Sequence, residues 1–292
     1  MLLSAGTTLA EAPKVSHTRA WVLFAPADAP GRIDPSGLIR TGDELVLVSD
    51  KAHLPGLYRL SFGAGHQARM HPWRTPYAAD AGHDTEGLAI CGNTIWMVVE
   101  GANQLVELPS EGPARTVRLN FDGVGTRIPP AVTWMNAGLE GVACAPDGRT
   151  WVAKEREPRA IYTIDASTGR ATGVWETWAA GDVERQVDGV TISPSWSDLQ
   201  YLDGHLYALH RDARAVVRLD PDTGARTGLM RLELEEDLLY ADAAPYGMAE
   251  GLWIEHGVVW ILLDNNDRTM RAGPRAGEPA PLLFEFPRPS GF

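Results

Sequence analysis

Glu86-Gly-Leu-Ala-Ile-Cys-Gly-Asn-Thr-Ile-Trp-Met-Val-Val-Glu100 is one copy of a pattern that occurs five times in this chain. Each copy opens on a short phrase such as Glu-Gly-Leu, passes a turn, and continues into an apolar run that ends on a charged residue. The copies begin at Ser36, Glu86, Glu140, Asp198 and Glu250, so their starts lie 50, 54, 58 and 52 residues apart. A period of this size indicates repeated small sheets arranged around a common axis.

Four strands can be traced in the second copy. Residues 87–90 form a short strand, 94–99 a wholly apolar strand, and 104–108 and 114–121 strands in which apolar and polar residues alternate. Alternation marks half-buried strands, and a continuous apolar run marks a strand inside a sheet. The other copies follow the same order, which predicts an all-β fold, a β-propeller built from four-stranded blades.

We expect five blades, with six as the alternative. A strand at 20–24 precedes the first copy, and pairing with the last strand of the chain would close the ring and remove its open edge. A sixth, irregular blade would have to lie in the Trp-rich segment 170–197, which equally fits an insertion over one mouth. The expected domains are an N-terminal extension at 1–19 and a single propeller domain at 20–292. A helix is conceivable only at 232–240.

Composition and charge narrow the classes of function. The 292 residues carry a formal charge of −12 and no cluster of Lys or Arg, whereas nucleic-acid binding requires a basic surface. No segment approaches the roughly 18 apolar residues of a membrane span. The first residues also lack the basic and apolar regions of a secretory signal. We expect a monomer that binds neither nucleic acid nor membrane, secreted or periplasmic if a leader has been removed and otherwise cytoplasmic.

The two cysteines, Cys91 and Cys144, follow the first strands of adjacent copies at equivalent places. A disulfide between them is conceivable, but we expect two buried free thiols, because unpaired Cys is a common core residue.

The acids that open the copies are the strongest candidates for a functional site. In a propeller the first strand of each blade lines the central channel, so Glu86, Glu140, Asp198 and Glu250 would converge on one axis, with Ser36 as the odd member. Converging carboxylates repel each other unless a cation or shared protons offset their charge. Oxygen ligands suit Ca²⁺, with Mg²⁺ or Mn²⁺ possible, and the scarcity of His argues against zinc. The alternative is that these acids only cap strand ends or pair with arginines.

A second series of acids ends the apolar strands at Asp50, Glu100, Glu155 and Asp264, with Arg211 or Asp212 in the fourth copy. We expect this series at the mouth of the channel opposite to the first series. For proton transfer the best candidate is His83, three residues before Glu86, because the ordinary pKa of His suits acid–base chemistry near neutral pH.

Three stretches resemble known propellers. Residues 139–165 and 198–209 resemble consecutive blades of the SdiA-regulated family of bacterial β-propellers. Residues 249–254 with 260–266 are similar to propellers of the phytase type with esterase-like activity. The resemblance covers about residues 30–270 and implies a calcium-binding propeller. By analogy with regucalcin and gluconolactonase-type propellers, Glu86, Glu140, Asp198 and Glu250 would hold the ion; Ser36 and Arg211 depart from that pattern.

Two functions follow as hypotheses. The first is a metal-dependent hydrolase of an ester, lactone or phosphoester at the channel mouth, in which the ion activates water and His83 moves protons. The second is a non-catalytic, calcium-stabilised propeller that binds a protein or carbohydrate partner. The feature that separates them is a general base standing beside the metal.

Overall fold

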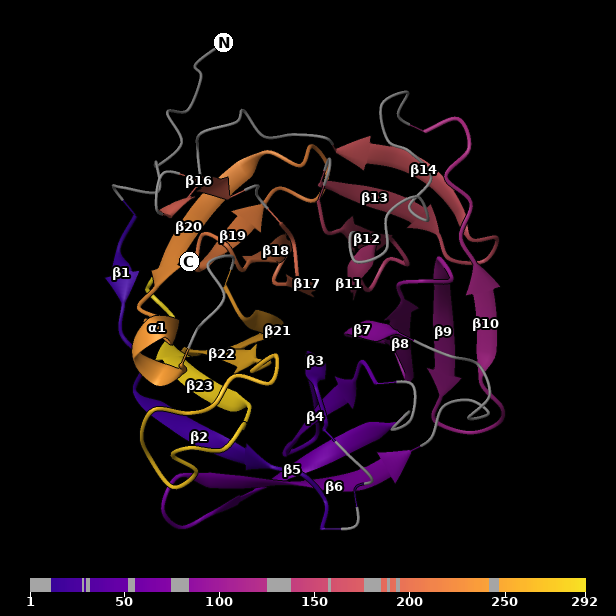
Figure 1. The fold of residues 1–292 in the computed structure, drawn as a ribbon. Coiled ribbons are helices and arrows are strands. Elements are labelled where there is room, and N and C mark those ends of the chain that lie inside the picture. The colour runs from indigo at the N-terminus through magenta and orange to yellow at the C-terminus, as the bar shows by residue number, and fades with distance from the viewer. Residues whose placement is uncertain are drawn as a thin grey trace.

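A computed structural model of the chain describes residues 12–27, 29, 32–51, 56–74, 84–124, 138–156, 159–175, 185–187, 190–192, 195–241 and 247–292. These residues are almost entirely in strands, and the fold is all-β and propeller-like (Figure 1). The described part of the chain contains no helix with the length and hydrophobicity that a membrane span requires.

The strands form antiparallel groups of four in chain order. The first group is β3 (Pro35–Thr41), β4 (Glu44–Ser49), β5 (Leu57–Gly63) and β6 (Gln67–Arg74). The second is β7 (Thr85–Cys91), β8 (Thr94–Val99), β9 (Gln104–Pro109) and β10 (Arg115–Arg118). The third is β11 (Leu139–Cys144), β12 (Thr150–Lys154), β13 (Ala160–Asp165) and β14 (Arg170–Trp175). The fourth is β17 (Asp198–Leu202), β18 (His205–His210), β19 (Ala215–Leu219) and β20 (Arg226–Leu232).

The fifth group combines both ends of the chain. It consists of β21 (Ala249–Glu255), β22 (Val258–Leu263), β23 (Leu282–Pro287) and β2 (Arg19–Phe24). As the sequence predicted, the N-terminal strand β2 lies antiparallel beside the C-terminal strand β23. It also pairs in parallel with β6, which joins the fifth and first groups into one eight-stranded sheet.

Four short elements lie outside this scheme. β1 (Lys14–Val15) adds a parallel strand to β20, so part of the predicted N-terminal extension is bound to the fourth group. Helix α1 (Glu236–Leu239) falls inside the stretch where a helix was conceivable. Within the Trp-rich segment, β14 completes the third group, while β15 (Arg185–Val187) and β16 (Val190–Ile192) pair only with each other among the described strands.

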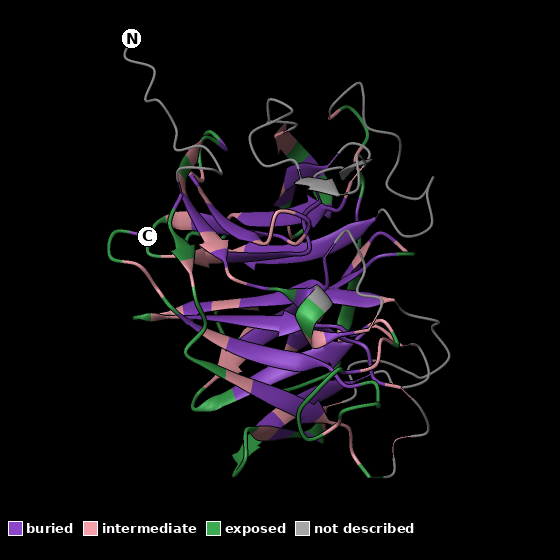
Figure 2. Ribbon diagram, turned by 60° about the vertical axis from the view of Figure 1, so that its left-hand side comes forward, coloured by how far each residue is buried: buried purple, intermediate pink, exposed green. Residues whose placement is uncertain are grey.

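The buried side chains follow from the strand patterns. The second strand of each group is almost wholly apolar and buried, as in β8, because neighbouring groups cover it on both faces. The outer strands alternate buried and exposed residues, as β6 does. Figure 2 accordingly shows buried residues running through the strands and exposed residues at turns and edges.

The first strands of the groups surround the centre, and glycine sets their spacing (Figure 1). A Cβ added to Gly37 of β3 would lie 2.5 Å from the carbonyl oxygen of Glu86 in β7. One on Gly87 would lie 2.5 Å from that of Glu140 in β11, and one on Gly141 would lie 2.7 Å from the backbone nitrogen of Leu199 in β17. Real Cβ atoms do not approach backbone this closely, so these positions require glycine.

The same strands meet in cyclic order through two further contacts. Between β17 and β21, the Asp198 carboxylate accepts a 2.8 Å hydrogen bond from the Leu252 N–H. Between β21 and β3, a Cβ on Gly251 would lie 3.0 Å from the Leu38 Cβ. The inner strands therefore pack directly on one another, each against the next.

The expectation of two free thiols is wrong: Cys91 and Cys144 form a disulfide. The two residues end β7 and β11, which are adjacent inner strands held close by Gly87. Their Cα atoms are 5.5 Å apart, a normal spacing for a disulfide. The bond therefore ties the second group to the third.

We predict that Gly87→Ala destabilises the protein by about 1–3 kcal/mol or more, because its methyl group would overlap the backbone of β11. Gly101→Ala is the matched control, since a Cβ there meets nothing within 4 Å. Denaturant unfolding of both variants tests this, and equal midpoints would contradict the packing described for the inner strands.

We also predict that replacing both cysteines by alanine lowers the free energy of unfolding by about 4 kcal/mol, the loop-entropy estimate for a closed loop of this length. The sequence separation of the two residues is 53. Guanidinium unfolding measures the loss. Thiol titration of the denatured, unreduced protein provides the check, and two reactive thiols would show that the bond does not form.

Candidate functional site

The two series of acids lie at the same mouth of the channel, which corrects the expectation of opposite mouths. The first and second strands of each group are antiparallel, so the start of one lies beside the end of the other. Thr85 pairs with Val99 across β7 and β8, which places Glu86 and Glu100 at the same end of the group. We refer to this end as the acidic mouth.

A β-bulge presents three acids of the first series, Glu86, Glu140 and Glu250, and also Ser36. The strand register shifts around Ser36, Glu86, Glu140 and Glu250, in each case next to the glycine that contacts the neighbouring strand. A bulge adds a residue and re-aims its side chain.

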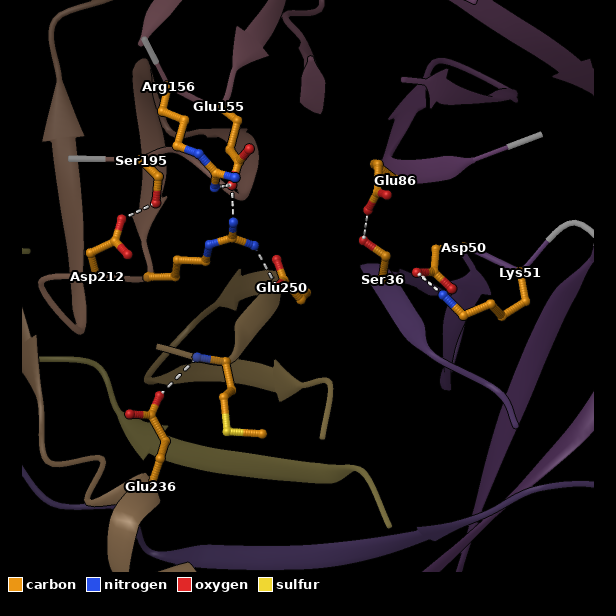
Figure 3. A network of polar contacts seen from close by, with 12 residues as sticks. Ser36, Asp50, Lys51, Glu86, Glu155, Arg156, Ser195, Asp212, Glu236 and Glu250 are labelled. Carbon is orange, nitrogen blue, oxygen red and sulfur yellow. Dashed lines mark hydrogen bonds and ion pairs between the residues drawn. The ribbon is translucent and has the colours of Figure 1, made fainter. Parts of the chain in front are cut away.

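One carboxylate triad consists of Asp50, Asp84 and Glu86, whose oxygens lie within 4.8 Å of one another. Ser36 donates a 2.6 Å hydrogen bond to Oε2 of Glu86 (Figure 3). Burial, and then repulsion by Asp50 and Asp84, holds the pKa of Glu86 well above its usual range. Burial also raises the pKa of Asp50 to about 7.

Lys51 and Asp34 flank this triad. The Lys51 ammonium lies 2.8 Å from Oδ2 of Asp50 and 2.7 Å from Oδ2 of Asp34, and Arg32 also pairs with that Asp34 oxygen. Although partial burial opposes it, the carboxylates of Asp34 and Asp50 raise the pKa of Lys51 above its usual value, so the ammonium stays protonated at neutral pH. These cations offset part of the negative charge on this side of the mouth.

The other triad consists of Glu100, Glu140 and Glu155, all buried, again with oxygens within 4.8 Å. The Gly138 N–H donates a 2.7 Å hydrogen bond to Oε1 of Glu100. Burial nonetheless raises the pKa of Glu100 to about 7. Burial and the charge of Glu86 raise the pKa of Glu140 well above its usual value, so the two triads influence each other.

Arg211 supplies a buried positive charge at the same mouth. Its Nη1 lies 2.6 Å from Oε1 of Glu250, and its Nη2 pairs with Oε1 of Glu155. Arg156 also pairs with Glu155, on the side of the mouth that faces the Ser36–Glu86 pair across the centre (Figure 3). The arginine that breaks the second series of acids thus neutralises one side of the mouth.

Several carboxylate oxygens at the mouth are buried and have no hydrogen-bond partner among the described residues: Asp34 Oδ1, Asp50 Oδ1, Glu250 Oε2 and Asp264 Oδ1. Burial and the nearby charges of Asp34 and Glu250 raise the pKa of Asp264 well above its ordinary value. Leaving buried oxygens without partners is costly. Carboxylate oxygens are the ligands that hard divalent cations prefer, so this donor set fits a bound metal.

The structure separates the four predicted ligands. Glu86 and Glu140 belong to the two triads, and Glu250 is held by Arg211. Asp198 accepts hydrogen bonds on both carboxylate oxygens, from the Leu199 and Leu252 N–H groups, each 2.8 Å long. It therefore has the fewest free lone pairs of the four. His83 lies outside the described residues.

The position of Asp198 has a simple cause. Leu199 pairs with Ala208 as Leu88 pairs with Met97, so Asp198 takes the place of Gly87 rather than that of Glu86. The fourth copy lacks one residue and its β17–β18 pairing has no bulge.

Sequence reasoning missed Asp34, Asp84 and Lys51, and it placed Glu100 and Glu155 at the wrong mouth. The pairing rule for antiparallel strands was the signal that would have placed the second series correctly. The shorter phrase Asp198-Leu199, against Glu-Gly-Leu elsewhere, was the signal for the shift of Asp198.

Behind the acids the channel is narrow and mainly apolar. It holds a cavity of about 60 Å³ whose lining includes Leu38, Leu88, Leu199 and Leu252 from four of the inner strands. This volume suits a few water molecules rather than an organic ligand. Polar chemistry on the axis is therefore concentrated at the acidic mouth.

We predict that the chelator-treated protein loses stability as pH rises from 5 to 8. The raised pKa values of Asp50 and Glu100, both about 7, mean that the folded state holds protons that the unfolded state has released. This contribution to stability is complete below the ordinary carboxyl pKa of the unfolded chain and is lost as pH rises from there through the folded pKa. Urea unfolding at several pH values measures the trend.

Glu100→Gln is the test variant, because it removes one of these protons and should flatten the slope. Burial lowers the pKa of His210, so below pH 6.5 this residue makes stability rise with pH. Its contribution is the same in the wild type and in the variant, and it cancels when the two slopes are subtracted. An unchanged slope in the variant would contradict the assignment.

Several solved structures of low sequence identity are similar to this chain, and the first of them shares its fold. The glutaminyl cyclase of Myxococcus xanthus is 17% identical, with a TM-score of 0.55 over 94% of this chain and 97% of that chain. The PQQ-bound aldose sugar dehydrogenase of Streptomyces coelicolor is 13% identical, with a TM-score of 0.47 over 92% and 99% of the chains. The virginiamycin B lyase of Staphylococcus aureus is 14% identical, with a TM-score of 0.42 over 90% and 72%.

The family comparison is more direct. No curated protein matches the sequence. A family model described as phytase-like, esterase-like activity of phytase, matches residues 34–266. That match spans the four acids that open the repeats and both triads, and it agrees with the phytase-type part of the resemblance. The chain therefore belongs to the phytase-like family.

Proposed function

We propose that this protein is a metal-dependent hydrolase of an ester, lactone or phosphoester that works at the acidic mouth. The observation that carries the proposal is the pair of carboxylate triads, one buried and one half-buried, beside buried carboxylate oxygens that lack partners among the described residues. The family match to a phytase-like, esterase-like group supports a hydrolase.

We propose Glu86 and Glu140 as metal ligands, because each opens a repeat and also belongs to one of the two triads. Asp50, Asp84, Glu100 and Glu155 would complete the donor set, with Glu250 and Asp198, the other ligands predicted from the repeat, nearby. We propose Ca²⁺ as the ion, since it accepts many carboxylate oxygens in flexible geometry. When bound, the ion would polarise a substrate oxygen and lower the pKa of a coordinated water.

The residues of the chain prepare the site in three ways. Ser36 and the Gly138 N–H orient Glu86 and Glu100 by hydrogen bonds of 2.6 and 2.7 Å. Arg211 pairs with Glu155 and Glu250, and it stands at a position where the other copies carry an acid. His83, next to Asp84 in the sequence, is the proposed proton carrier.

We further propose that the five groups are five blades and that β2 closes the ring. The cyclic contacts of the inner strands and the pairing of β2 with β23 support this count. The Cys91–Cys144 disulfide favours an oxidising compartment, secreted or periplasmic. We also propose that the protein is a monomer and that it is similar to the SdiA-regulated propellers.

A non-catalytic, calcium-stabilised propeller that binds a protein or carbohydrate partner is the second candidate. The salt bridges of Lys51 with Asp50 and of Arg211 with Glu250 favour it, because they hold the carboxylates in place and need no reaction. The two candidates share the metal site and differ in whether a hydrolytic reaction depends on it.

We predict that Ca²⁺ raises the melting temperature of the chelator-treated protein. At a hundredfold excess over Kd, the bound ion should add about 2.7 kcal/mol to the free energy of unfolding. Glu140→Gln should abolish that rise while leaving the metal-free protein as stable or more so, since it removes a repelled buried charge. Glu111→Gln, at an exposed turn, is the control. Mg²⁺ and Mn²⁺ are added back separately to identify the ion.

Activity decides between the two candidates. Aryl esters, lactones and aryl phosphates are tested with the wild type, with Glu140→Gln and with Glu111→Gln. Hydrolysis that needs the cation and is lost only in Glu140→Gln supports the hydrolase. A cation-dependent melting shift without any hydrolysis supports the binding propeller, and no shift with any cation refutes both.

A further inference from the structure

A second cavity lies between the first and second groups of strands, away from the acidic mouth. Its volume is about 590 Å³, within the range of small-molecule sites. The β3–β4 and β7–β8 turns, at Gly42 and Gly92, form part of its wall. β3 carries Ser36 at the acidic mouth and Thr41 at this cavity, so the two sites are about 16 Å apart along the strand.

The charge of this cavity is opposite to that of the protein. Arg40 and Arg74 line it, and no Asp or Glu does among the described residues, although the whole chain has a formal charge of −12. The other polar lining groups are hydroxyls and an amide, from Thr41, Asn93, Thr94 and Ser110. This set of donors suits an anion.

Both guanidinium groups are held in place by the protein. Nη2 of Arg74 donates a 2.9 Å hydrogen bond to the Pro109 carbonyl oxygen, across the gap between the two groups of strands. Nη1 of Arg40 lies 2.6 Å from Oε1 of Glu255, and its Nε donates to the Gly42 carbonyl oxygen at 3.2 Å. A guanidinium has five N–H donors, so each keeps donors for a ligand, and Arg74 has no carboxylate partner among the described residues.

The rest of the lining is apolar. Trp73 forms one wall, with the Arg59 guanidinium 4.4 Å from its ring centroid, and Ile90, Ile95 and Leu108 add aliphatic surface. Arg59 is itself paired with Glu44 at 3.1 Å, which keeps the Trp73 ring covered on that side. A ligand here would meet fixed cations and an apolar wall at once.

We propose that this cavity binds a small organic anion, a phosphate or carboxylate attached to a planar or apolar body. Arg74 is the anion-binding residue and Trp73 contacts the apolar body. The site is separate from the acidic mouth and does not depend on a cation there.

Calorimetric titration with phenyl phosphate and with benzoate, in the presence of chelator, tests the proposal. We expect at least one of the two anions to bind with one molecule per chain. Uncharged benzyl alcohol and inorganic phosphate should bind at least tenfold more weakly. The chelator removes any cation from the acidic mouth, so the two proposals are tested independently. If no anion binds in this titration, the hydrolase proposal stands. If the cation has no effect on stability or activity, the anion site stands.

Two variants locate the binding. Arg74→Gln removes the cation, and Asn93→Asp adds a negative charge at an exposed turn without changing the size of the side chain, so that it should fold normally. Each should weaken binding about tenfold or more. Arg115→Gln, at an exposed ion pair with Glu107 in the second group, is the control and should bind as the wild type does.

The proposal is overturned if neither anion binds the wild type. It is also overturned if Asn93→Asp and Arg74→Gln bind as tightly as Arg115→Gln.

Discussion

The close approach of the inner strands is the constraint on which the rest of the structure depends. Gly37, Gly87 and Gly141 allow each strand to lie against the backbone of the next, at distances that a Cβ would forbid. Because the acid stands beside the glycine in three of the five copies, the same contacts that close the centre also bring the acids together. Fold and site therefore arise from one short phrase repeated along the chain, and the disulfide Cys91–Cys144 secures one of these contacts.

Gathering the acids has an electrostatic cost that the structure meets only in part. Lys51 and Arg211 pair with Asp50 and Glu250, and Ser36 donates to Glu86. Other buried carboxylate oxygens stay without partners among the described residues, and burial raises the pKa values of Asp50, Glu250 and Asp264. Protons or a cation must supply the remaining compensation. If the proposed cation binds, this competition would let a single mouth respond both to pH and to the divalent metal.

Much of the fold could be predicted from the sequence, because strand patterns and the repeat period are local signals. The pairing of the N-terminal strand with the C-terminal strand was predicted as well, from the need to cover an open edge. The features that the sequence did not predict depend on which strand ends lie next to one another in the folded protein. The shared mouth of the two acid series, the shift of Asp198 into a glycine position, and the pairing of Cys91 with Cys144 are all consequences of register and of neighbouring strands. Arg211 was visible as a break in the pattern, but its role required knowing that Glu155 and Glu250 lie on either side of it.

We propose that the inner strands assemble a cation site from carboxylates of different repeats. The most direct measurement is anomalous diffraction from crystals soaked in Mn²⁺, an ion that accepts the same oxygen ligands and can be located by its own scattering. We expect a peak at the acidic mouth, in contact with carboxylate oxygens of Glu86 or Glu140 and of their triad partners. Crystals with fully occupied manganese at other sites and no peak at this mouth would contradict it.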